Sequence, residues 1–242
     1  MHNSSAVEDY LKTIYNLSGE DEAASTSAIA GQLGIASGSV TGMLKRLADQ
    51  GLVEHVPYYG ARLSRAGEHA AVSLIRRHRI LEMFLVQILG YTWDRVHEEA
   101  DQLEHAVSDE LIDRMAQVLG SPEVDPHGAP IPSLGRTFVE QKYPTLAEMK
   151  IGQNAVLRRV RDEDAEVLRY LAELHLVPGA EVTLTGRGPF KGPLYVQVGE
   201  HAHILSDELA RSIFVELRDS KRSKAARPKS TAGRPARVGG ES

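Results

Sequence analysis

The chain has 242 residues, of which 42% are apolar, a net charge of -5 and no cysteine. This length suits one large domain or about two to three small ones, and the lack of cysteine excludes disulfides, zinc-thiolate sites and iron-sulfur clusters. No apolar run approaches the roughly 18 residues of a membrane span, and the N-terminus lacks a signal-peptide pattern, so we expect a cytoplasmic protein with no membrane partner.

The charge is unevenly distributed. The segment from residue 218 onward has eight Lys or Arg residues against two acidic ones, so it carries +6 and the first 217 residues carry -11. The segment is also rich in Pro, Gly and Ser, which is typical of a disordered arm. We therefore predict a disordered basic tail over residues 218–242, which either contacts polyanions or only keeps the protein soluble.

Residues 1–73 are predicted to form a winged helix-turn-helix domain. One helix is expected over residues 5–17, and two shorter helices are joined through Gly34, which is the helix-turn-helix pattern. The second of these is expected to be capped by Ser37 or Ser39. Two strand-like segments, LVEHVP and ARLS, follow and predict a hairpin wing.

This domain carries a set of candidate DNA contacts. The third helix begins with small hydroxyl residues and continues to two cations, which suits a helix N-terminus in the major groove with cations near phosphates. The wing can reach the DNA backbone or the minor groove. The predicted contact residues are Ser37, Ser39, Thr41, Lys45, Arg46, Tyr58 and Arg62.

A helical domain over residues 74–140 carries the candidate metal ligands. His78 and Glu82 are four residues apart on a helix expected over residues 64–89, so they share a face. The next helix has four ligand-type residues within roughly a 100° arc, namely His97, Asp101, Glu104 and His105. Two antiparallel helices with these side chains can close around a divalent cation; a solvated charged face is the alternative.

The same helices have more apolar positions than three helices can bury against one another, including those of a third helix that begins after Ser108. A homodimer through this region resolves the excess. It would also set two winged helices at a fixed spacing on palindromic double-stranded DNA.

The C-terminal part is predicted to be a small β-barrel. The Pro-rich segment SPEVDPHGAPIPS is a natural boundary, and residues 141–150 are expected to be a linker. Four short strand patterns with one inserted helix then fit a barrel over residues 151–217. His201 and His203 alternate with apolar residues there, and we expect them to be surface or core histidines. The predicted fold class is therefore mainly α with a small β domain.

These parts and their motifs resemble the diphtheria toxin repressor family of iron- and manganese-dependent transcriptional regulators. The resemblance extends from about residue 7 to 217 and is carried by VEDYLKTIY, GLV, IRRHRILEMFL, RVHEEADQLEHAVSDEL and DPHGAPIP. It implies a repressor of metal-uptake genes and an SH3-like, FeoA-like third domain. It assigns the activating site to Asp9, Asp101, Glu104 and His105, and a second site to His78, Glu82 and His97.

The resemblance also bears on the metal. Iron-type members place Met and Cys where this chain has Asp9 and Asp101, whereas manganese-type members place carboxylates there. Hard oxygen ligands suit Mn(II), so Mn(II) is favoured over Fe(II), with Co(II) or Zn(II) possible in vitro. Members with a two-metal site have a glutamate where this chain has Lys12, so that arrangement is not carried over. In iron-type members the third domain adds ligands, and here Asp162, Glu163, Asp164 and Glu166 match none of these positions clearly.

Asp9 belongs to the DNA-binding domain and its co-ligands to the dimerisation domain, so metal binding is expected to fix the orientation of the winged helix. Two alternatives stay open. One is a metal-independent winged-helix regulator that binds an organic ligand. The other, a dimetal carboxylate enzyme, needs Glu-x-x-His on each of two helices, which this chain lacks. We therefore expect no enzymatic activity and no small organic substrate.

Overall fold

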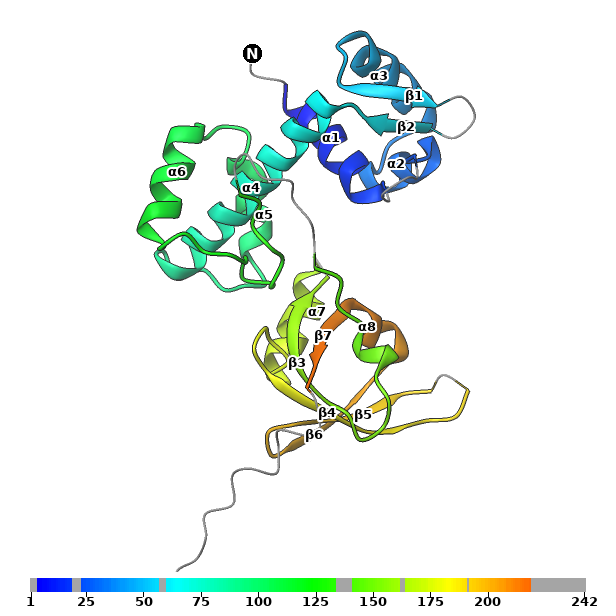
Figure 1. Ribbon diagram of the computed structural model, residues 1–242, viewed down its shortest axis with the longest axis vertical. Coiled ribbons are helices and arrows are strands. Elements are labelled where there is room, and N and C mark those ends of the chain that lie inside the picture. The colour runs from blue at the N-terminus through cyan, green and yellow to red at the C-terminus, as the bar shows by residue number, and fades with distance from the viewer. Residues whose placement is uncertain are drawn as a thin grey trace, which may run out of the picture.

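The structure is a computed structural model that describes residues 4–18, 23–56, 60–133, 141–161, 164–190 and 192–218. Tyr58 and the predicted tail beyond Arg218 lie outside these residues. Figure 1 shows three units along the chain: an N-terminal winged helix, a helical unit and a β unit. The predicted fold class, mainly α with a small β domain, is confirmed.

The N-terminal unit is a winged helix-turn-helix. Its elements are α1 (Ser5–Leu17), α2 (Thr26–Leu33), α3 (Ser37–Asp49), β1 (Val53–Val56) and β2 (Gly60–Leu63). The two strands pair antiparallel and form the wing. Gly34 ends α2 with a positive φ of 65°, which glycine adopts without steric cost. Fully buried side chains such as Leu11, Ile29 and Leu44 hold the helices together.

One predicted helix start is wrong. The residue that precedes α3 is Ala36, and no side chain caps the helix there. Ser37 and Ser39 lie inside the first turn instead, and both are exposed. Their side chains are therefore exposed on the surface of the helix and do not cap its start.

The helical unit consists of α4 (Arg65–Gln87), α5 (Val96–Leu103) and α6 (Asp109–Val118). Ser64 begins the 23-residue α4, because its hydroxyl accepts a hydrogen bond from the Gly67 amide at 3.1 Å. This helix contacts α1 and the wing strand β2 as well as α5 and α6 (Figure 1). Since α4 packs against both units, it sets α1 beside α5, which carries candidate metal ligands.

The β unit is a five-stranded sheet with the strand order β6-β5-β4-β3-β7, in which all neighbours pair antiparallel. Its elements are η1 (Leu146–Glu148), β3 (Asn154–Val160), α7 (Ala165–Glu173), β4 (Glu181–Arg187), β5 (Leu194–Val198), β6 (His201–Leu205), α8 (Asp207–Ser212) and β7 (Ile213–Leu217). Leu146 and Met149, from the segment predicted as a linker, are buried in its core. None of the described helices combines the length and apolar character that a membrane crossing requires.

A loop after α6 joins the helical unit to the β unit. The amide of Val160 in β3 donates a 2.9 Å hydrogen bond to the carbonyl of His127. Gly128 has a φ of +85°, and a Cβ there would lie 1.9 Å from the carbonyl oxygen of Arg158. Glycine is therefore required for this close approach, which fixes the backbone of His127 against the sheet.

Candidate metal centre and DNA-binding surface

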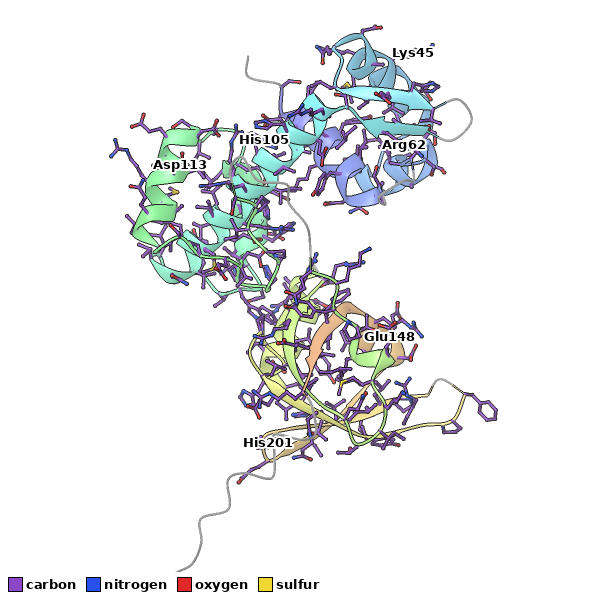
Figure 2. The ribbon with its side chains drawn as sticks, viewed as in Figure 1. Lys45, Arg62, His105, Asp113, Glu148 and His201 are labelled. Atoms are coloured by element: carbon purple, nitrogen blue, oxygen red, sulfur yellow. The ribbon has the colours of Figure 1, made fainter. Side chains whose placement is uncertain are left out.

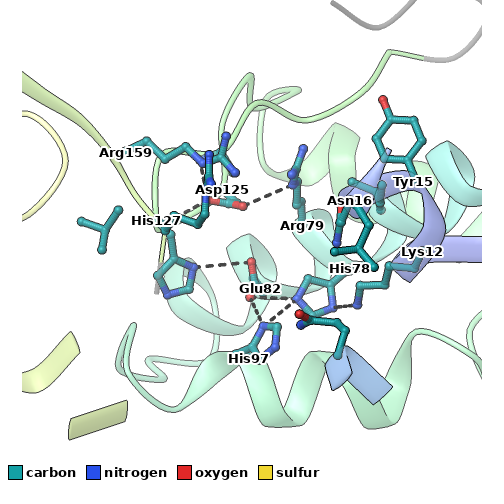
Figure 3. Close-up of a pocket in the computed structure, with 16 residues that line it drawn as sticks. Lys12, Tyr15, Asn16, His78, Arg79, Glu82, His97, Asp125, His127 and Arg159 are labelled. Carbon is teal, nitrogen blue, oxygen red and sulfur yellow. Dashed lines mark hydrogen bonds and ion pairs between the residues drawn. The ribbon is translucent and has the colours of Figure 1, made fainter. Parts of the chain in front are cut away.

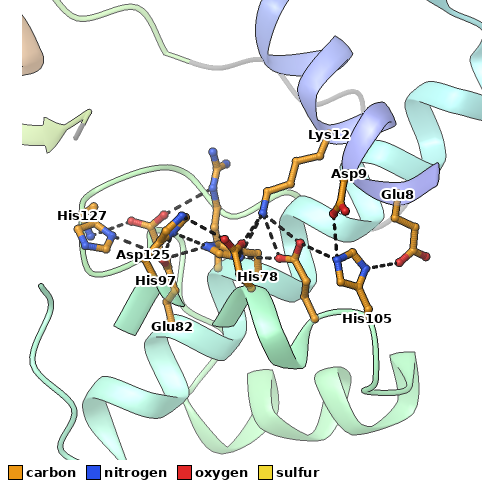
Figure 4. Close-up of polar contacts among 12 residues, drawn as sticks. Glu8, Asp9, Lys12, His78, Glu82, His97, His105, Asp125 and His127 are labelled. Atoms are coloured by element: carbon orange, nitrogen blue, oxygen red, sulfur yellow. Dashed lines mark hydrogen bonds and ion pairs between the residues drawn. The ribbon is translucent and has the colours of Figure 1, made fainter. Parts of the chain in front are cut away.

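The first cluster of candidate ligands joins two units of the fold (Figure 4). Asp9 comes from α1, and Glu104 and His105 come from the turn after α5. His105 Nε2 lies 3.0 Å from Asp9 Oδ1 and 3.7 Å from Glu104 Oε1. One ligand atom from each residue lies within 4.8 Å of the others, which is a spacing that one cation can bridge. Two carboxylates and an imidazole thus meet across the domain boundary.

The turn after α5 explains this geometry. The sequence predicted a continuous helix through residue 105, but α5 ends at Leu103 and Glu104 occupies the C-cap. Glu8 then orients His105, because its Oε2 lies 2.7 Å from His105 Nδ1 while Arg77 lies 3.6 Å from its other oxygen. An imidazole held through Nδ1 presents Nε2 to a metal, as in many metal sites. Sequence analysis did not identify Glu8, although it stands next to Asp9.

The second cluster consists of His78, His97 and Asp101. His78 Nε2 lies 3.0 Å from His97 Nδ1, and His78 Nδ1 lies 3.2 Å from Asp101 Oδ1. The family resemblance assigned Asp101 to the activating site with Asp9, whereas here it groups with the two histidines. The two clusters adjoin, because His78 Nδ1 lies 2.5 Å from Glu104 Oε2.

A third cluster contains two residues that the sequence analysis missed. Glu82, Asp125 and His127 are all buried, and their ligand atoms lie within 4.8 Å of one another. Glu82 also contacts the second cluster, since its Oε1 lies 3.0 Å from His78 Nε2 and 3.2 Å from His97 Nδ1. The three clusters therefore form one continuous polar network.

The Asp-Pro-His-Gly sequence was the available signal for the third cluster. It lies in the Pro-rich segment that we interpreted only as a boundary. Asp125 Oδ1 accepts hydrogen bonds from the amides of His127 and Ala129 at 2.8 and 2.9 Å, which closes the loop. His127 Nε2 lies 2.8 Å from the carbonyl oxygen of Trp93, and this contact orients its Nδ1 toward Glu82 at 3.7 Å.

Burial and charge shape the protonation of the network. Burial alone would lower the pKa of His78, but hydrogen bonds to Asp101, Glu104 and Glu82 raise it well above its usual value. Burial alone would raise the pKa of Glu82, but hydrogen bonds from His127, His78 and His97 lower it well below its usual value. The carboxylates around His78 thus favour a proton on its ring, and a metal bound to His78 would take the place of that proton.

His78 and His97 of the second cluster and all three residues of the third cluster line a cavity of about 630 Å³ (Figure 3). Its walls come from α1, α4, the loop that carries Asp125 and His127, and strand β3. Figure 3 shows Glu82 between His78 and His127, and Arg79 pairs with Asp125 at 3.5 Å. The cavity therefore gives solvent a route to buried ligands.

Lys12 lies among these ligands. Its Nζ donates hydrogen bonds to Asp101 Oδ1 at 3.0 Å and to both oxygens of Glu104 at 3.1 Å. Burial alone would lower the pKa of Lys12, but the charges of Glu104 and Asp101 raise it. The side chain is thus a charged ammonium that links α1 to α5.

The donor chemistry of the clusters fits a divalent cation. Asp9, Glu104 and His105 supply carboxylate oxygens and one imidazole nitrogen, with Glu104 only 1% exposed. Such oxygen and nitrogen donors are those of hard or borderline divalent ions. Among the residues that the structure describes, the β unit adds no side chain to the three clusters. Asp164 accepts from the Glu166 amide at the start of α7 instead.

The predicted DNA contacts gather on another face of the N-terminal unit. Ser37, Ser39, Thr41, Lys45, Arg46 and Arg62 are all exposed. Figure 2 shows Lys45 on α3 and Arg62 on β2, both on the side away from His105. Thr41 Oγ1 donates to the carbonyl of Ser37 at 3.1 Å, so it can offer only its lone pairs outward. A Cβ added at Gly38 or Gly42 would meet nothing within 4 Å.

Comparison with known proteins shows the family to which the chain belongs. Models of the iron dependent repressor N-terminal DNA binding domain, the iron dependent repressor metal binding and dimerisation domain and the FeoA domain match residues 2–61, 64–133 and 145–217. The diphtheria toxin repressor of Corynebacterium efficiens is 34% identical over 222 residues, which cover 88% of this chain and 95% of that protein. The chain belongs to the diphtheria toxin repressor family.

Other members of the family differ in the metal to which they respond. A solved structure of a manganese-dependent transcriptional repressor in complex with manganese is 35% identical, has a TM-score of 0.79 and covers 86% of this chain and 98% of its own. The iron-dependent repressor IdeR of Mycobacterium leprae is 28% identical and covers 86% of this chain and 96% of its own. The family consists of metal-dependent transcriptional repressors rather than enzymes. This confirms the predicted metal-dependent regulator and the prediction that the chain is not an enzyme.

Proposed function

We propose that this chain is a manganese-activated repressor of metal-uptake genes, in which the metal state of the Asp9 cluster controls the position of the DNA-binding unit. The observation that carries the proposal is the 3.0 Å approach of Asp9 on α1 to His105 after α5. Because one ligand belongs to the DNA-binding unit and two belong to the helical unit, occupancy of the cluster depends on how the two units are oriented.

The chain's own residues determine this switch. Burial raises the pKa of Asp9, and the negative charge of the nearby Glu104 carboxylate raises it further. The two carboxylates therefore repel each other. A divalent cation supplies the positive charge that offsets this repulsion. Asp9 then holds α1, and α1 positions α3 through the shared core of the N-terminal unit. Operator binding and metal binding should therefore strengthen each other reciprocally.

The ligand set supports manganese over iron. Asp9 and Asp101 offer oxygen where sulfur ligands would favour softer metals, and the described clusters contain only carboxylates and imidazoles. In this proposal Asp101 completes the activating site with Asp9, Glu104 and His105, and Glu82, Asp125 and His127 form a further site with His78 and His97. Action on chromosomal DNA fits the predicted cytoplasmic location.

A DNA-binding assay across metals tests the proposal. The full chain would select its operator from a random-sequence library in the presence of Mn(II), and affinity would then be measured with Mn(II), Fe(II), Co(II), Zn(II) or a chelator. We expect Mn(II) to raise affinity by about 5- to 150-fold over the chelator control. Equal affinity with all four metals and the chelator would contradict a metal-activated regulator, and a stronger response to Fe(II) would contradict the manganese assignment.

We further propose that the functional unit is a homodimer on a palindromic operator. In the single chain, α6 carries an apolar stripe at positions i, i+4 and i+7 whose two ends are exposed: Leu111 is 43% exposed and Val118 is 68% exposed, whereas Met115 between them is partly buried against the core of the helical unit. Exposed apolar side chains that align along one face of a helix suit a surface that packs against another protein chain. A second copy packed on α6 would bury it and place two α3 helices at a fixed spacing.

Removal of single cations on α3 should weaken DNA binding, because each cation is expected to neutralise a phosphate. Lys45→Ala or Arg46→Ala should lower operator affinity and reduce the salt slope of log K by about one for each phosphate that is no longer neutralised. The measurement is operator affinity at several salt concentrations with Mn(II). Lys150→Ala, which removes an exposed cation of the β unit, is the matched control. An unchanged slope would show that these residues do not contact phosphate.

A further inference from the structure

The ammonium of Lys12 occupies the space between the first two ligand clusters. Asp9 and Lys12 stand three residues apart on α1, so both side chains reach the same region of the helical unit. The Lys12 Nζ atom lies 3.0 to 3.1 Å from three carboxylate oxygens of Asp101 and Glu104 and 3.3 Å from His78 Nδ1. All of these atoms belong to candidate metal ligands.

The surroundings of Lys12 make it more than a surface ion pair. Its side chain is only 20% exposed and that of Glu104 only 1%. A buried carboxylate requires a compensating positive charge or hydrogen-bond donors, because an unpaired buried charge is strongly destabilising. Lys12 provides this charge from α1, across the same boundary that Asp9 crosses.

The Lys12 ammonium also prevents a metal ion from binding at the place that it occupies. A metal bound to Asp101, Glu104 and His78 would have to stand roughly where the ammonium stands, since ligand atoms reach a metal from about 2 Å. A dication and an ammonium only a few ångströms apart would also repel each other in a site that is screened little by solvent. The hydrogen bonds of Lys12 go to His78, Asp101 and Glu104 rather than to Asp9 or His105, so the latter two side chains remain available to a metal ion.

We infer that Lys12 is a built-in cation that takes the place of one metal ion between α1 and α5. It compensates Glu104 and Asp101 when no metal is bound, and it limits the adjoining Asp9 and His78 clusters to fewer ions than their ligands would otherwise hold. This inference rests on the proposed metal site. It assigns to the chain itself part of the charge compensation that the metal completes.

The first test counts metal ions. Wild-type chain and Lys12→Glu would be dialysed to equilibrium against Mn(II), and bound manganese would be measured by elemental analysis. We expect Lys12→Glu to bind one more Mn(II) per chain, because a cation is removed and a carboxylate ligand is added beside Asp101 and Glu104. Equal stoichiometry in the two proteins would overturn the inference.

The second test needs no DNA and uses a variant that adds no ligand. Lys12→Met keeps nearly the length of the side chain and removes its charge. In chelator it should unfold at a lower Tm than wild type, and Mn(II) should close the difference, so its manganese-induced rise in Tm should be larger by at least about 2 °C. A fall in Tm that manganese does not reverse would show a merely structural lysine and overturn the inference.

The controls separate this inference from the proposed function. Lys150→Glu and Lys150→Met make the same changes at an exposed lysine of the β unit and should match wild type in both measurements. Neither readout involves DNA. If wild type showed no manganese-dependent operator binding, the proposed function would fail, whereas the stoichiometry and Tm results would still decide the role of Lys12.

Discussion

Asp9→Ala is expected to leave a folded dimer that no longer gains operator affinity from Mn(II). The Asp9 side chain is 46% exposed and pairs with His105 near the surface, so the substitution removes little that holds the fold together. It does remove the only ligand of the first cluster that comes from α1. The gain of about 5- to 150-fold that coupling of this kind provides should therefore disappear.

Operator affinity with Mn(II) and with chelator is the decisive measurement for Asp9→Ala, with the dimer checked by sedimentation. Glu98→Ala is the matched control, since Glu98 is an exposed carboxylate on α5 that belongs to none of the three clusters. It should respond to Mn(II) as wild type does. If Asp9→Ala kept the full manganese response, Asp9 would not couple the two units.

Val118→Glu is expected to dissociate the dimer and to weaken operator binding on the order of 100-fold. Val118 is 68% exposed in the single chain, so a glutamate there costs the monomer little. In a dimer the charge would be buried in an apolar interface, which is strongly unfavourable. Each winged helix would then bind its half-site alone, without the gain of about 100- to 10,000-fold from linkage of two binding modules.

The measurements for Val118→Glu are sedimentation and operator affinity over a range of protein concentrations. Leu111→Glu, at the other end of the same stripe, should also dissociate the dimer and weaken operator binding. Tyr170→Glu introduces the same charge at a residue of α7 that is 44% exposed, and it should stay dimeric. A dimeric Val118→Glu with normal affinity would place the interface elsewhere.

Much of the fold was accessible from local patterns. The helices expected over residues 5–17 and 64–89, the junction at Gly34 and the helix that begins after Ser108 are all found close to the predicted positions. These features depend on residues a few positions apart, so a sequence contains them directly. The predicted helix limits were wrong at the start of α3 and at the end of α5, where the local sequence signals are weakest.

The site was accessible only in part. Spacing on the helices and the family motifs pointed to seven candidate ligands, and the structure brings all seven into one network. Spacing could not predict how they divide, because Asp101 can face either Asp9 or His78 from the same position on α5. Nor could it connect Asp125 and His127 to Glu82, since a loop after α6 brings them there.

By itself, the sequence determined the order of the three units, the family and the ligand types that suit a divalent cation. Only the tertiary structure decided which ligands share a cluster, that Glu8 holds His105 and that Lys12 stands between Asp101 and Glu104. The physical reason is the separation along the chain: Glu8 and His105 are 97 positions apart, and Lys12 and Asp101 are 89 apart. Contacts of that range arise from the packing of α1 and α5 on α4, and no local spacing encodes them.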